Sequence, residues 1–398
     1  MCATSISTSV EIGLRFVGIW PGLSYGNFSW FAYMTSLVVA LYFQYVYIFE
    51  HFDIDNISNL IDAFSITLAY SLGFLKLISL WSNRRTFYDI LLAMDRDWSD
   101  ASTVGRDRSL LCIMRDNASL SRRCSNMLIS INATAAMCYA ITGLVRQSGD
   151  FKEDLNVSSR ELPIKMEFPF KVDASPLFEL LVVGQCLHEV SIAALVATMN
   201  SLIVTLVLHV SGQIDILRQE LSMIHYDASR PRESIVGGIR LLIVRHQRII
   251  TLSDNIDVLY SNIALMQFMS NTVVICCIGL TIIGSLAKVG LSMVLMKTVI
   301  FYIAVTLEAF IFCFAGEYLS AKSKSIGDAA YESLWYKMTP AECRVLLFVI
   351  LRSQKRLTIT AGNVVDLSLE GFTSVRILSY DYAPYRHDKQ TGLRENVC

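Results

Sequence analysis

Long apolar stretches alternate with polar segments along the chain, and most are about as long as a lipid bilayer is thick. An α-helix rises about 1.5 Å per residue, so about 20 apolar residues cross a hydrocarbon core of about 30 Å. The pattern predicts seven membrane-spanning helices, with the two ends of the chain on opposite sides of the membrane. The stretches cover residues 28–49, 60–81, 126–145, 177–210, 263–287, 292–315 and 341–380.

Arginine is distributed unequally between these stretches, and this sets the predicted orientation. Short cytosolic loops retain Lys and Arg, whereas the opposing loops do not. Residues 82–124 carry eight arginines and residues 211–262 carry six, whereas residues 50–59 carry none. The first ten residues hold no basic segment, so we expect no secretory signal. The N-terminus and both arginine-rich segments are therefore predicted to be cytosolic.

The outer loop at residues 146–176 fits the pattern less well, because it holds five basic residues among six acidic ones. It is long enough to escape the charge rule. This loop also contains the sequon at Asn156, the one Asn-x-Ser/Thr sequence in a roomy outer segment. We expect Asn156 to be a candidate glycosylation site.

The fourth stretch is longer than a membrane requires. As one helix, residues 177–210 would measure about 50 Å, so they must tilt or project into the cytosol. The next segment, residues 233–260, is polar, but its apolar residues recur at helical spacing. The fifth helix should therefore also begin outside the membrane. Together the two predict a packed cytosolic layer beneath the spans.

The composition agrees with lipid as the solvent of this chain. Its residues are 53% hydrophobic and 17% charged, against about 25% charged in soluble proteins. The net charge is −1 and no long basic run occurs, which argues against a nucleic-acid partner. The ten cysteines show no ligand spacing, so we expect them to pack as small apolar side chains, without a metal or cofactor.

Six ionisable residues lie within or at the edge of apolar stretches, where each is unfavourable unless paired. Glu179 and Lys76 are expected near the interfaces, where long side chains reach water. His188-Glu189 begins like a HExxH zinc motif, but Ile192 stands where the second histidine is needed. We therefore expect neither a metal site nor a catalytic set. The six are Asp62, Lys76, Glu179, His188, Glu189 and Glu308.

The last quarter of the chain carries an ordered set of short motifs, and a further motif precedes the first span. In this order and spacing they resemble the signature of insect odorant receptors, which are subunits of odour-gated cation channels. The resemblance implies one all-α integral membrane domain over residues 1–398, with a cytosolic N-terminus. The motifs are Gly18-Ile19-Trp20-Pro21, Gly316-Glu317, Ala330-Tyr331-Glu332-Ser333-Leu334-Trp335-Tyr336, Arg352-Ser353-Gln354-Lys355-Arg356 and Thr360-Ala361-Gly362.

The seventh stretch is predicted to be split into two helices. Thr339-Pro340-Ala341-Glu342 has capping-box spacing with proline at the first helical position. The helix that starts there runs for only about 21 Å before the basic motif at 352–356 interrupts it. The resemblance implies that this first piece joins a cytosolic anchor where four subunits meet, and that the second piece lines a central pore. Tyr331, Trp335 and Tyr336 are the predicted anchor residues.

The second piece, residues 358–380, carries four polar residues at intervals of three, four and four: Asn363, Asp366, Glu370 and Ser374. As a helix, this spacing places them on one face. Because intramembrane polar residues usually face water or the bundle interior, we predict that they line the pore. Carboxylates there would attract cations. Buried polar packing between helices is the alternative.

The resemblance also implies an odour pocket among the outer halves of the second, third, fourth and sixth spans. A mostly apolar pocket of this kind favours small, volatile, largely apolar ligands. Candidate contacts are chosen for depth and for size or polarity, and ordinary helix packing is the competing interpretation for each. They are Phe64, Thr67, Leu68, Tyr139, Gly143, Phe178, Gln185 and Tyr302.

As partners, the resemblance implies membrane lipid, a small volatile odorant and an obligate co-receptor in a hetero-tetramer at the plasma membrane of a sensory dendrite. Three other classes of protein fit the sequence less well. A G-protein-coupled receptor would need an outer N-terminus and DRY and NPxxY motifs, which are missing. A gustatory receptor shares the fold, but its TYxxxxxQF element is missing. A membrane enzyme or transporter would show clustered His, Asp and Glu or an inverted repeat, and neither is visible.

Residues 381–398 depart from the family pattern, which calls for a further apolar turn or two after Ser379-Tyr380. Pro384 would remove a hydrogen bond and clash with the carbonyl of Tyr380, which should end the helix. The expected gate positions, near Tyr385 and Lys389, would then lie in a polar tail. Two explanations stay open: an unusual outer mouth, or a gene model that continues past its last splice site.

Overall fold

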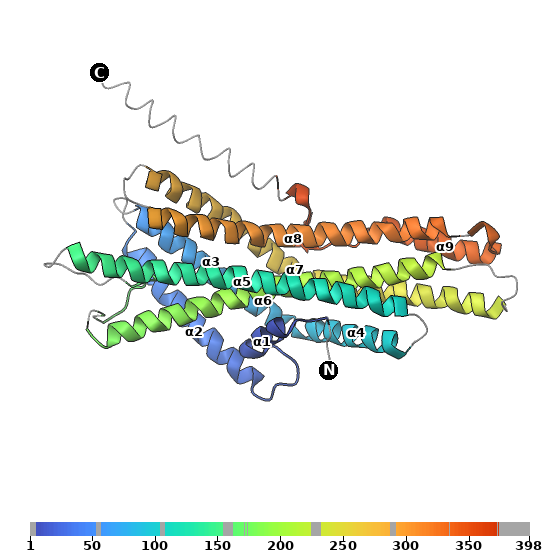
Figure 1. The fold of residues 1–398 in the computed structure, drawn as a ribbon, viewed down its shortest axis with the longest axis horizontal. Coiled ribbons are helices and arrows are strands. Elements are labelled where there is room, and N and C mark those ends of the chain that lie inside the picture. Colours follow the sequence, from blue (N-terminus) through green and yellow to red (C-terminus); the bar gives the residue numbers. More distant parts are fainter. Residues whose placement is uncertain are drawn as a thin grey trace, which may run out of the picture.

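The protein is an elongated bundle of helices in the computed structural model, which describes residues 5–52, 57–103, 108–153, 162–170, 172, 174–223, 232–286, 292–333, 335–371 and 373. Figure 1 shows the long helices side by side along one axis. The elements are α1 (Thr8–Val17), α2 (Gly26–Glu50), α3 (Ile57–Ser82), α4 (Arg84–Thr103), α5 (Arg108–Glu153), α6 (Leu177–Ser222), α7 (Arg232–Leu286), α8 (Ser292–Glu332), the 3-10 helix η2 (Trp335–Lys337), α9 (Pro340–Gln354), β1 (Thr360–Ala361) and β2 (Val365–Asp366).

Six helices of the described part are long and apolar enough to cross a membrane: α2, α3, α5, α6, α7 and α8. Their surfaces agree with a lipid environment, since α2 leaves Phe28 and Phe49 each 78% exposed. The prediction of an all-α protein with several membrane spans is therefore confirmed. Within the described residues the seventh stretch adds no further span, because α9 has only 15 residues, or about 22 Å.

Helices α5 to α8 are much longer than a bilayer is thick. α6 has 46 residues and α7 has 55, which corresponds to roughly 70 to 80 Å. The prediction that the fourth and fifth helices continue past the membrane is thus confirmed. Beyond the spans, α4 packs against α7 and α9 packs against α8, and both lie at the same end of the bundle (Figure 1). We call this end the α4–α9 end and the opposite one the α2–α3 end.

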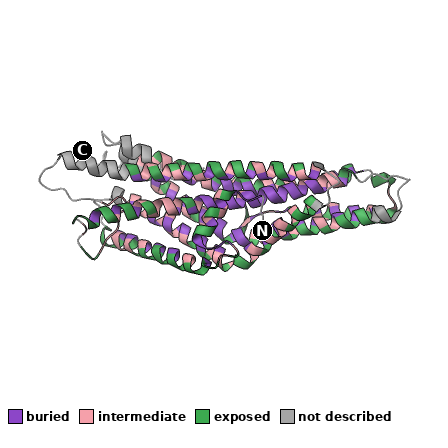
Figure 2. Ribbon diagram, turned by 60° about the horizontal axis from the view of Figure 1, so that its bottom comes forward, coloured by how far each residue is buried: buried purple, intermediate pink, exposed green. Residues whose placement is uncertain are grey.

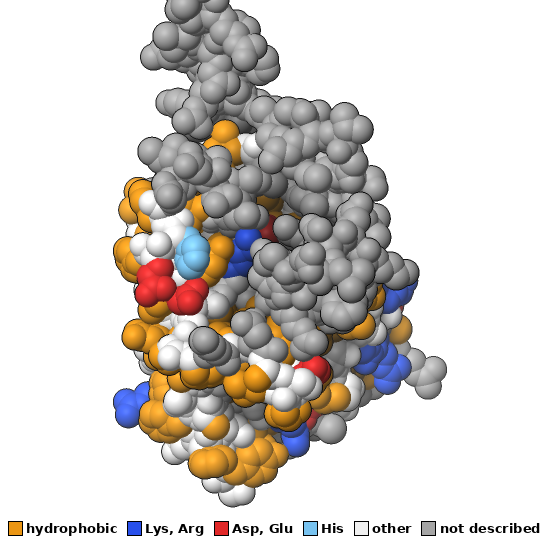
Figure 3. Space-filling model, turned by 90° about the vertical axis from the view of Figure 1, so that its left-hand side faces the viewer, with side chains coloured by type: hydrophobic (Ala, Val, Ile, Leu, Met, Phe, Trp, Pro, Cys, Tyr) orange, Lys and Arg blue, Asp and Glu red, His pale blue; other side chains and the backbone are white. Residues whose placement is uncertain are grey.

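Helix α6 supplies the centre of the hydrophobic core. Every residue from Ala197 to Ile203 is buried, on all sides of the helix. A helix segment buried on all sides needs neighbours around it, and α6 contacts α1, α5, α7 and α8. Figure 2 shows the buried residues concentrated along the middle of the bundle. Figure 3 looks at the α2–α3 end, where charged side chains lie among hydrophobic ones.

The start of α9 follows the sequence prediction. The Glu342 carboxylate accepts a hydrogen bond from the Thr339 backbone N–H at 2.8 Å, and Pro340 is the first helical residue. Proline suits this position because it has no N–H to leave unpaired. The capping interaction therefore fixes where the chain turns into α9.

The predicted helix over residues 358–380 is wrong in its first half. Thr360 and Ala361 pair with Asp366 and Val365 in an antiparallel hairpin. At its turn, Gly362 (φ 62°) and Asn363 (φ 58°) are left-handed, a conformation that glycine and asparagine adopt most readily. Helical backbone resumes only at Leu369. Asn363 and Asp366 therefore do not share a helical face, and Ser374 lies outside the described residues.

Candidate ligand-binding site

A cavity of about 140 Å³ lies inside the bundle, between α3, α5, α6, α7 and α8. An apolar protein cavity of about 150 Å³ is known to hold benzene, so this one matches a molecule with a single ring. Five alanines from four helices line the cavity, and their small side chains leave the space open. They are Ala69, Ala135, Ala136, Ala193 and Ala304.

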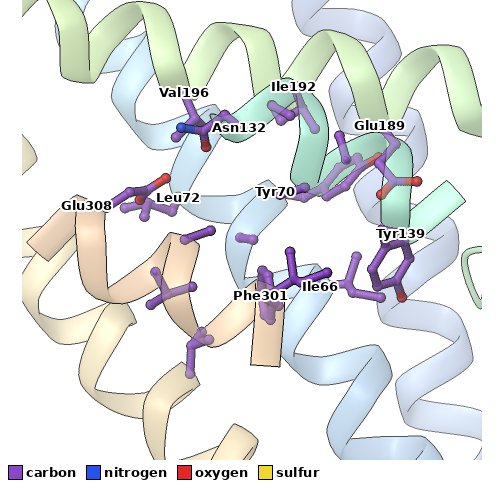
Figure 4. A pocket seen from close by; sticks show the side chains of 18 of the residues that line it. Ile66, Tyr70, Leu72, Asn132, Tyr139, Glu189, Ile192, Val196, Phe301 and Glu308 are labelled. Carbon is purple, nitrogen blue, oxygen red and sulfur yellow. The ribbon is translucent and has the colours of Figure 1, made fainter. Parts of the chain in front are cut away.

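The cavity is mostly apolar, with a few polar side chains at defined places. Ile66, Ile192 and Phe301 belong to its apolar wall. Figure 4 shows Glu308 near one end and Glu189 at the other. A concave, largely apolar pocket with a few convergent polar groups is the usual form of a small-molecule site.

The Glu308 end belongs to a buried polar cluster made of Lys76, Gln267, Asn271 and Glu308. Gln267 Nε2 donates to Glu308 Oε2 at 2.8 Å and to Asn271 Oδ1 at 2.7 Å. Asn271 Nδ2 donates to the Val305 carbonyl at 3.3 Å. The cluster therefore joins α3, α7 and α8 at this end of the cavity, with Asn271 and Glu308 in its wall.

Lys76 corrects an expectation, because it does not reach water. Its side chain is 1% exposed and its Nζ lies 4.0 Å from Glu308 Oε2. Nζ also lies 5.8 Å from the centre of the Phe312 ring, an attractive arrangement for a cation. Helix α3 packs against α7, so this face of α3 points into the bundle. The lysine is paired inside the protein.

Near the Glu189 end, His188 is held by aromatic side chains. Its ring is stacked 5.5 Å from Tyr70 and 6.2 Å from Tyr33, measured between ring centres. Tyr33 Oη also lies 3.2 Å from Ser191 Oγ. The two ring contacts give His188 a packing role.

The structure brings one of the eight predicted ligand residues to the cavity wall within the described part, namely Tyr139. Leu68 and Tyr302 lie directly behind the wall, where they pack with Val274 and Val305, which line the cavity. Sequence reasoning missed Tyr70 and Asn132 and did not connect Glu189 or Glu308 with the pocket. For Glu189 and Glu308, the signal in the sequence was an ionisable residue inside an apolar stretch.

Phe64, Thr67, Phe178 and Gln185 do not line the cavity. Gln185 donates to the Ile164 carbonyl and accepts from its N–H, both at 3.1 Å, and so ties the loop before α6 to that helix. Thr67 donates to the Ala63 carbonyl at 2.9 Å. Phe178 is buried and Phe64 half-buried. The surroundings of Gly143, and the whole of Asn156, lie outside what the structure describes.

The hairpin that follows α9 is fastened to α7. Asp257 Oδ1 accepts hydrogen bonds from the N–H and the hydroxyl of Thr360, at 2.7 and 2.9 Å. Ser261 Oγ accepts from the Asn363 N–H at 2.9 Å. These contacts place β1 and its turn on α7. Asp366 lies beside Thr358, whose hydroxyl donates to its carboxylate at 3.1 Å.

The predicted anchor residues are largely exposed on the isolated chain. Tyr331 is 68%, Trp335 44% and Tyr336 64% exposed. Phe348 and Leu351 of α9 are 70% and 50% exposed. Large exposed apolar side chains in one region mark an interaction surface. We call these five residues the α9 surface.

A Ser–His–Asp arrangement occurs near the N-terminus, but its burial argues against catalysis. Ser5 Oγ lies 3.2 Å from His209 Nδ1, and His209 Nε2 lies 3.1 Å from Asp97 Oδ2. Trp98 Nε1 donates to the same serine hydroxyl at 2.7 Å. Ser5 is 4% exposed, and the adjoining cavity of about 10 Å³ has room for about one water. The arrangement fastens the N-terminal segment to α4 and α6.

Comparison with known proteins places this geometry among insect chemoreceptors. Residues 56–380 match a family model described as 7tm Odorant receptor. Odorant receptor 82a of Drosophila melanogaster is 22% identical over 346 residues, covering 86% of this chain and 88% of that protein. Odorant receptor 10 of Aedes albopictus is 24% identical over 314 residues, covering 77% and 78%.

A solved structure has the same fold. The insect olfactory receptor OR5 from Machilis hrabei, in complex with eugenol, superposes with a TM-score of 0.78 at 13% sequence identity, covering 94% of this chain and 95% of that one. At this identity the match describes the fold of the bundle.

Proposed function

The chain belongs to the 7tm odorant receptor family, and from that premise we propose that it binds small volatile odorants and, with a co-receptor, opens a non-selective cation channel. The observation that carries the proposal is the apolar cavity of about 140 Å³ between the spans. Its size and wall suit a compact, largely apolar molecule. The odorant receptor OR5 of Machilis hrabei was solved with eugenol, a precedent for small-molecule binding in this fold.

The route from cavity to channel runs through α7 and α8. Both helices line the cavity, and α7 holds the hairpin through Asp257. Gly316 of α8 lies against Leu367, directly after β2. A ligand that binds better to one arrangement of these helices shifts the protein toward it. The shift would move the residues after the hairpin, where we place the pore-lining Glu370.

The α9 surface is the proposed site of subunit assembly. Exposed aromatic and aliphatic side chains of this size are costly in water and are stabilised when another subunit covers them. We assign the surface to contacts with the co-receptor in a hetero-tetramer. From the arginine bias we assign this layer to the cytosol and Asn156 to the outside, and from the family resemblance we assign the complex to the plasma membrane of a sensory dendrite.

The test is odour-evoked current in cells that express the chain with a co-receptor, compared with cells that express either one alone. Ala193→Phe fills the cavity from α6 and should abolish the response. Val183→Phe adds a similar ring at a position of the same helix that is 57% exposed, and should leave the response intact. If the chain reaches the cell surface with its co-receptor but no single-ring odorant evokes a current, the proposed channel function is wrong.

A further inference from the structure

The polar end of the cavity offers a negatively charged acceptor. Glu308 lines the cavity, and Figure 4 shows its side chain at the cavity wall. Among the residues that the structure describes, Oε2 is the Glu308 oxygen that receives a hydrogen bond, from Gln267 at 2.8 Å. The second oxygen, Oε1, is left for a ligand. A carboxylate only accepts hydrogen bonds, and bonds to a charged oxygen are stronger than neutral ones.

Some of the neutral amide donors at this end are already engaged. Gln267 Nε2 uses both of its N–H groups, one on Glu308 and one on Asn271. Asn271 donates to a backbone carbonyl of α8 at 3.3 Å, and Asn132 donates to a carbonyl of its own helix at 2.9 Å. At Glu308 itself, a ligand oxygen that only accepts meets a carboxylate that repels its lone pairs. A ligand hydroxyl instead finds an acceptor.

The charge at this end favours a neutral donor over a cation. Lys76 Nζ already lies 4.0 Å from Glu308 Oε2, and the two side chains are 1% and 12% exposed. The pair is neutral as a whole. A protonated amine at the same carboxylate would bring a second positive charge into a region of low dielectric constant, where uncompensated charge is costly.

We propose that Glu308 sets the ligand class of this receptor: a neutral molecule with one ring and a hydroxyl group, a phenol or a small aromatic alcohol, whose O–H donates to Glu308 Oε1. The ring occupies the space left by the alanines, in a cavity of about 140 Å³. The assignment rests on the proposed function only in taking this cavity as the odorant site.

The ligand series needs no mutation. The full chain in complex with its co-receptor is solubilised, and binding is measured as the rise in melting temperature with ligand concentration. The probes are 4-methylphenol, 4-fluorotoluene, which has nearly the same shape without the O–H, benzaldehyde, which only accepts, and benzylamine, which is cationic. 4-Methylphenol should bind roughly ten- to a hundredfold more tightly than 4-fluorotoluene. Equal affinities, or tightest binding by benzylamine, overturn the assignment.

A matched pair of variants locates the effect at one end of the cavity. Glu308→Gln keeps the shape of the side chain and removes its charge, so the preference for 4-methylphenol should fall to a few-fold. Glu179→Gln removes a carboxylate at an exposed position of α6 outside the cavity wall and should leave the preference unchanged. Because Glu308→Gln leaves Lys76 without its counter-charge, the double variant Lys76→Met/Glu308→Gln serves if the single one does not fold. A full preference without the Glu308 carboxylate contradicts the proposal.

Two readouts separate this proposal from the channel function. Melting temperature reports binding at Glu308, whereas odour-evoked current reports gating. If the protein binds the phenol preferentially but gives no current, the proposed ligand class is supported and the proposed channel function is contradicted. If odorants evoke a current but the phenol is not preferred, the channel function is supported and the ligand class is contradicted.

Discussion

Asp257 of α7 accepts two hydrogen bonds from Thr360 of β1, at 2.7 Å from the backbone N–H and 2.9 Å from the hydroxyl. Thr360 opens the Thr360-Ala361-Gly362 motif that marks the C-terminal quarter. The motif therefore has a structural role: its first residue fastens the hairpin to a helix that also lines the candidate ligand cavity. Its third residue supplies the left-handed turn, with φ 62°.

Thr360→Val is expected to weaken the coupling between odour binding and current. The substitution keeps the β-branched shape but removes the hydroxyl, and a hydrogen bond to a charged group contributes about 1.5 to 3 kcal/mol. Peak odour-evoked current should fall at unchanged surface expression. Thr360→Ser retains the hydroxyl and should respond nearly as the wild type does. If the valine variant gives full current, this bond does not take part in gating.

Gly316→Ala should disturb the other attachment of the hairpin. A Cβ at this position would lie 2.5 Å from the Leu367 carbonyl oxygen, so α8 and the segment after β2 would have to separate. Gly279 of α7 has no heavy atom within 4 Å of its would-be Cβ. Gly279→Ala should therefore be neutral or slightly stabilising, by up to about 1 kcal/mol from helix propensity. Thermal unfolding of the solubilised complex compares the two, and equal melting temperatures would contradict the close packing at Gly316.

The sequence predicted those features that depend on local spacing. Apolar runs located the six spans, and Thr339-Pro340-Ala341-Glu342 located the start of α9, because capping needs only residues three apart. The resemblance to insect odorant receptors is confirmed by the family match over residues 56–380. These are the properties for which neighbours along the chain carry the information.

The hairpin and the cavity wall depended on contacts between distant residues. Spacing of three and four placed Asn363 and Asp366 on one helical face, but the left-handed turn at Gly362 and the anchoring Asp257 override that pattern. The sequence also did not show which face of α3 points into the bundle, so Lys76 was expected to reach water. Its partner Glu308 lies more than two hundred positions further along the chain, and no local pattern relates the two.

Trp335→Ala is expected to reduce assembly more than the stability of the single chain. Trp335 is 44% exposed and Tyr336 is 64% exposed, so truncation removes little packing within one chain. Aromatic residues at the centre of an interface commonly contribute 2 kcal/mol or more, on the order of a thirtyfold weaker association. Native gel electrophoresis or mass photometry of the solubilised complex with the co-receptor measures the extent of assembly. Leu180→Ala, at an exposed position of α6 near the α2–α3 end, is the control. If the Trp335→Ala variant assembles as the wild type does, Trp335 does not contribute to the subunit contact.

The predicted orientation rests on the distribution of arginine and can be tested directly. An epitope tag before Ser5 should be labelled only after the cells are permeabilised, and so should a tag in the loop after α6. A tag inserted near Asn156 should be labelled on intact cells. Surface labelling of the N-terminal tag would reverse the orientation and place the α9 surface outside.

The pore prediction now centres on Glu370, because helical backbone resumes at Leu369 and Glu370 lies in its first turn. Carboxylates in the subunits of a channel attract cations toward the pore and bind divalent ions. Glu370→Gln should therefore lower single-channel cation conductance and weaken block by divalent cations, while the odour concentration for half-maximal response stays within about twofold. Asp366→Asn is the comparison variant. The Asp366 carboxylate accepts a hydrogen bond from the Thr358 hydroxyl at 3.1 Å within the hairpin, so loss of this carboxylate should reduce the fraction of open channels more than the conductance of each channel.

Single-channel recordings distinguish the effects of the two variants. If Glu370→Gln shifts odour potency and leaves conductance and divalent block unchanged, Glu370 packs between helices and does not line the pore.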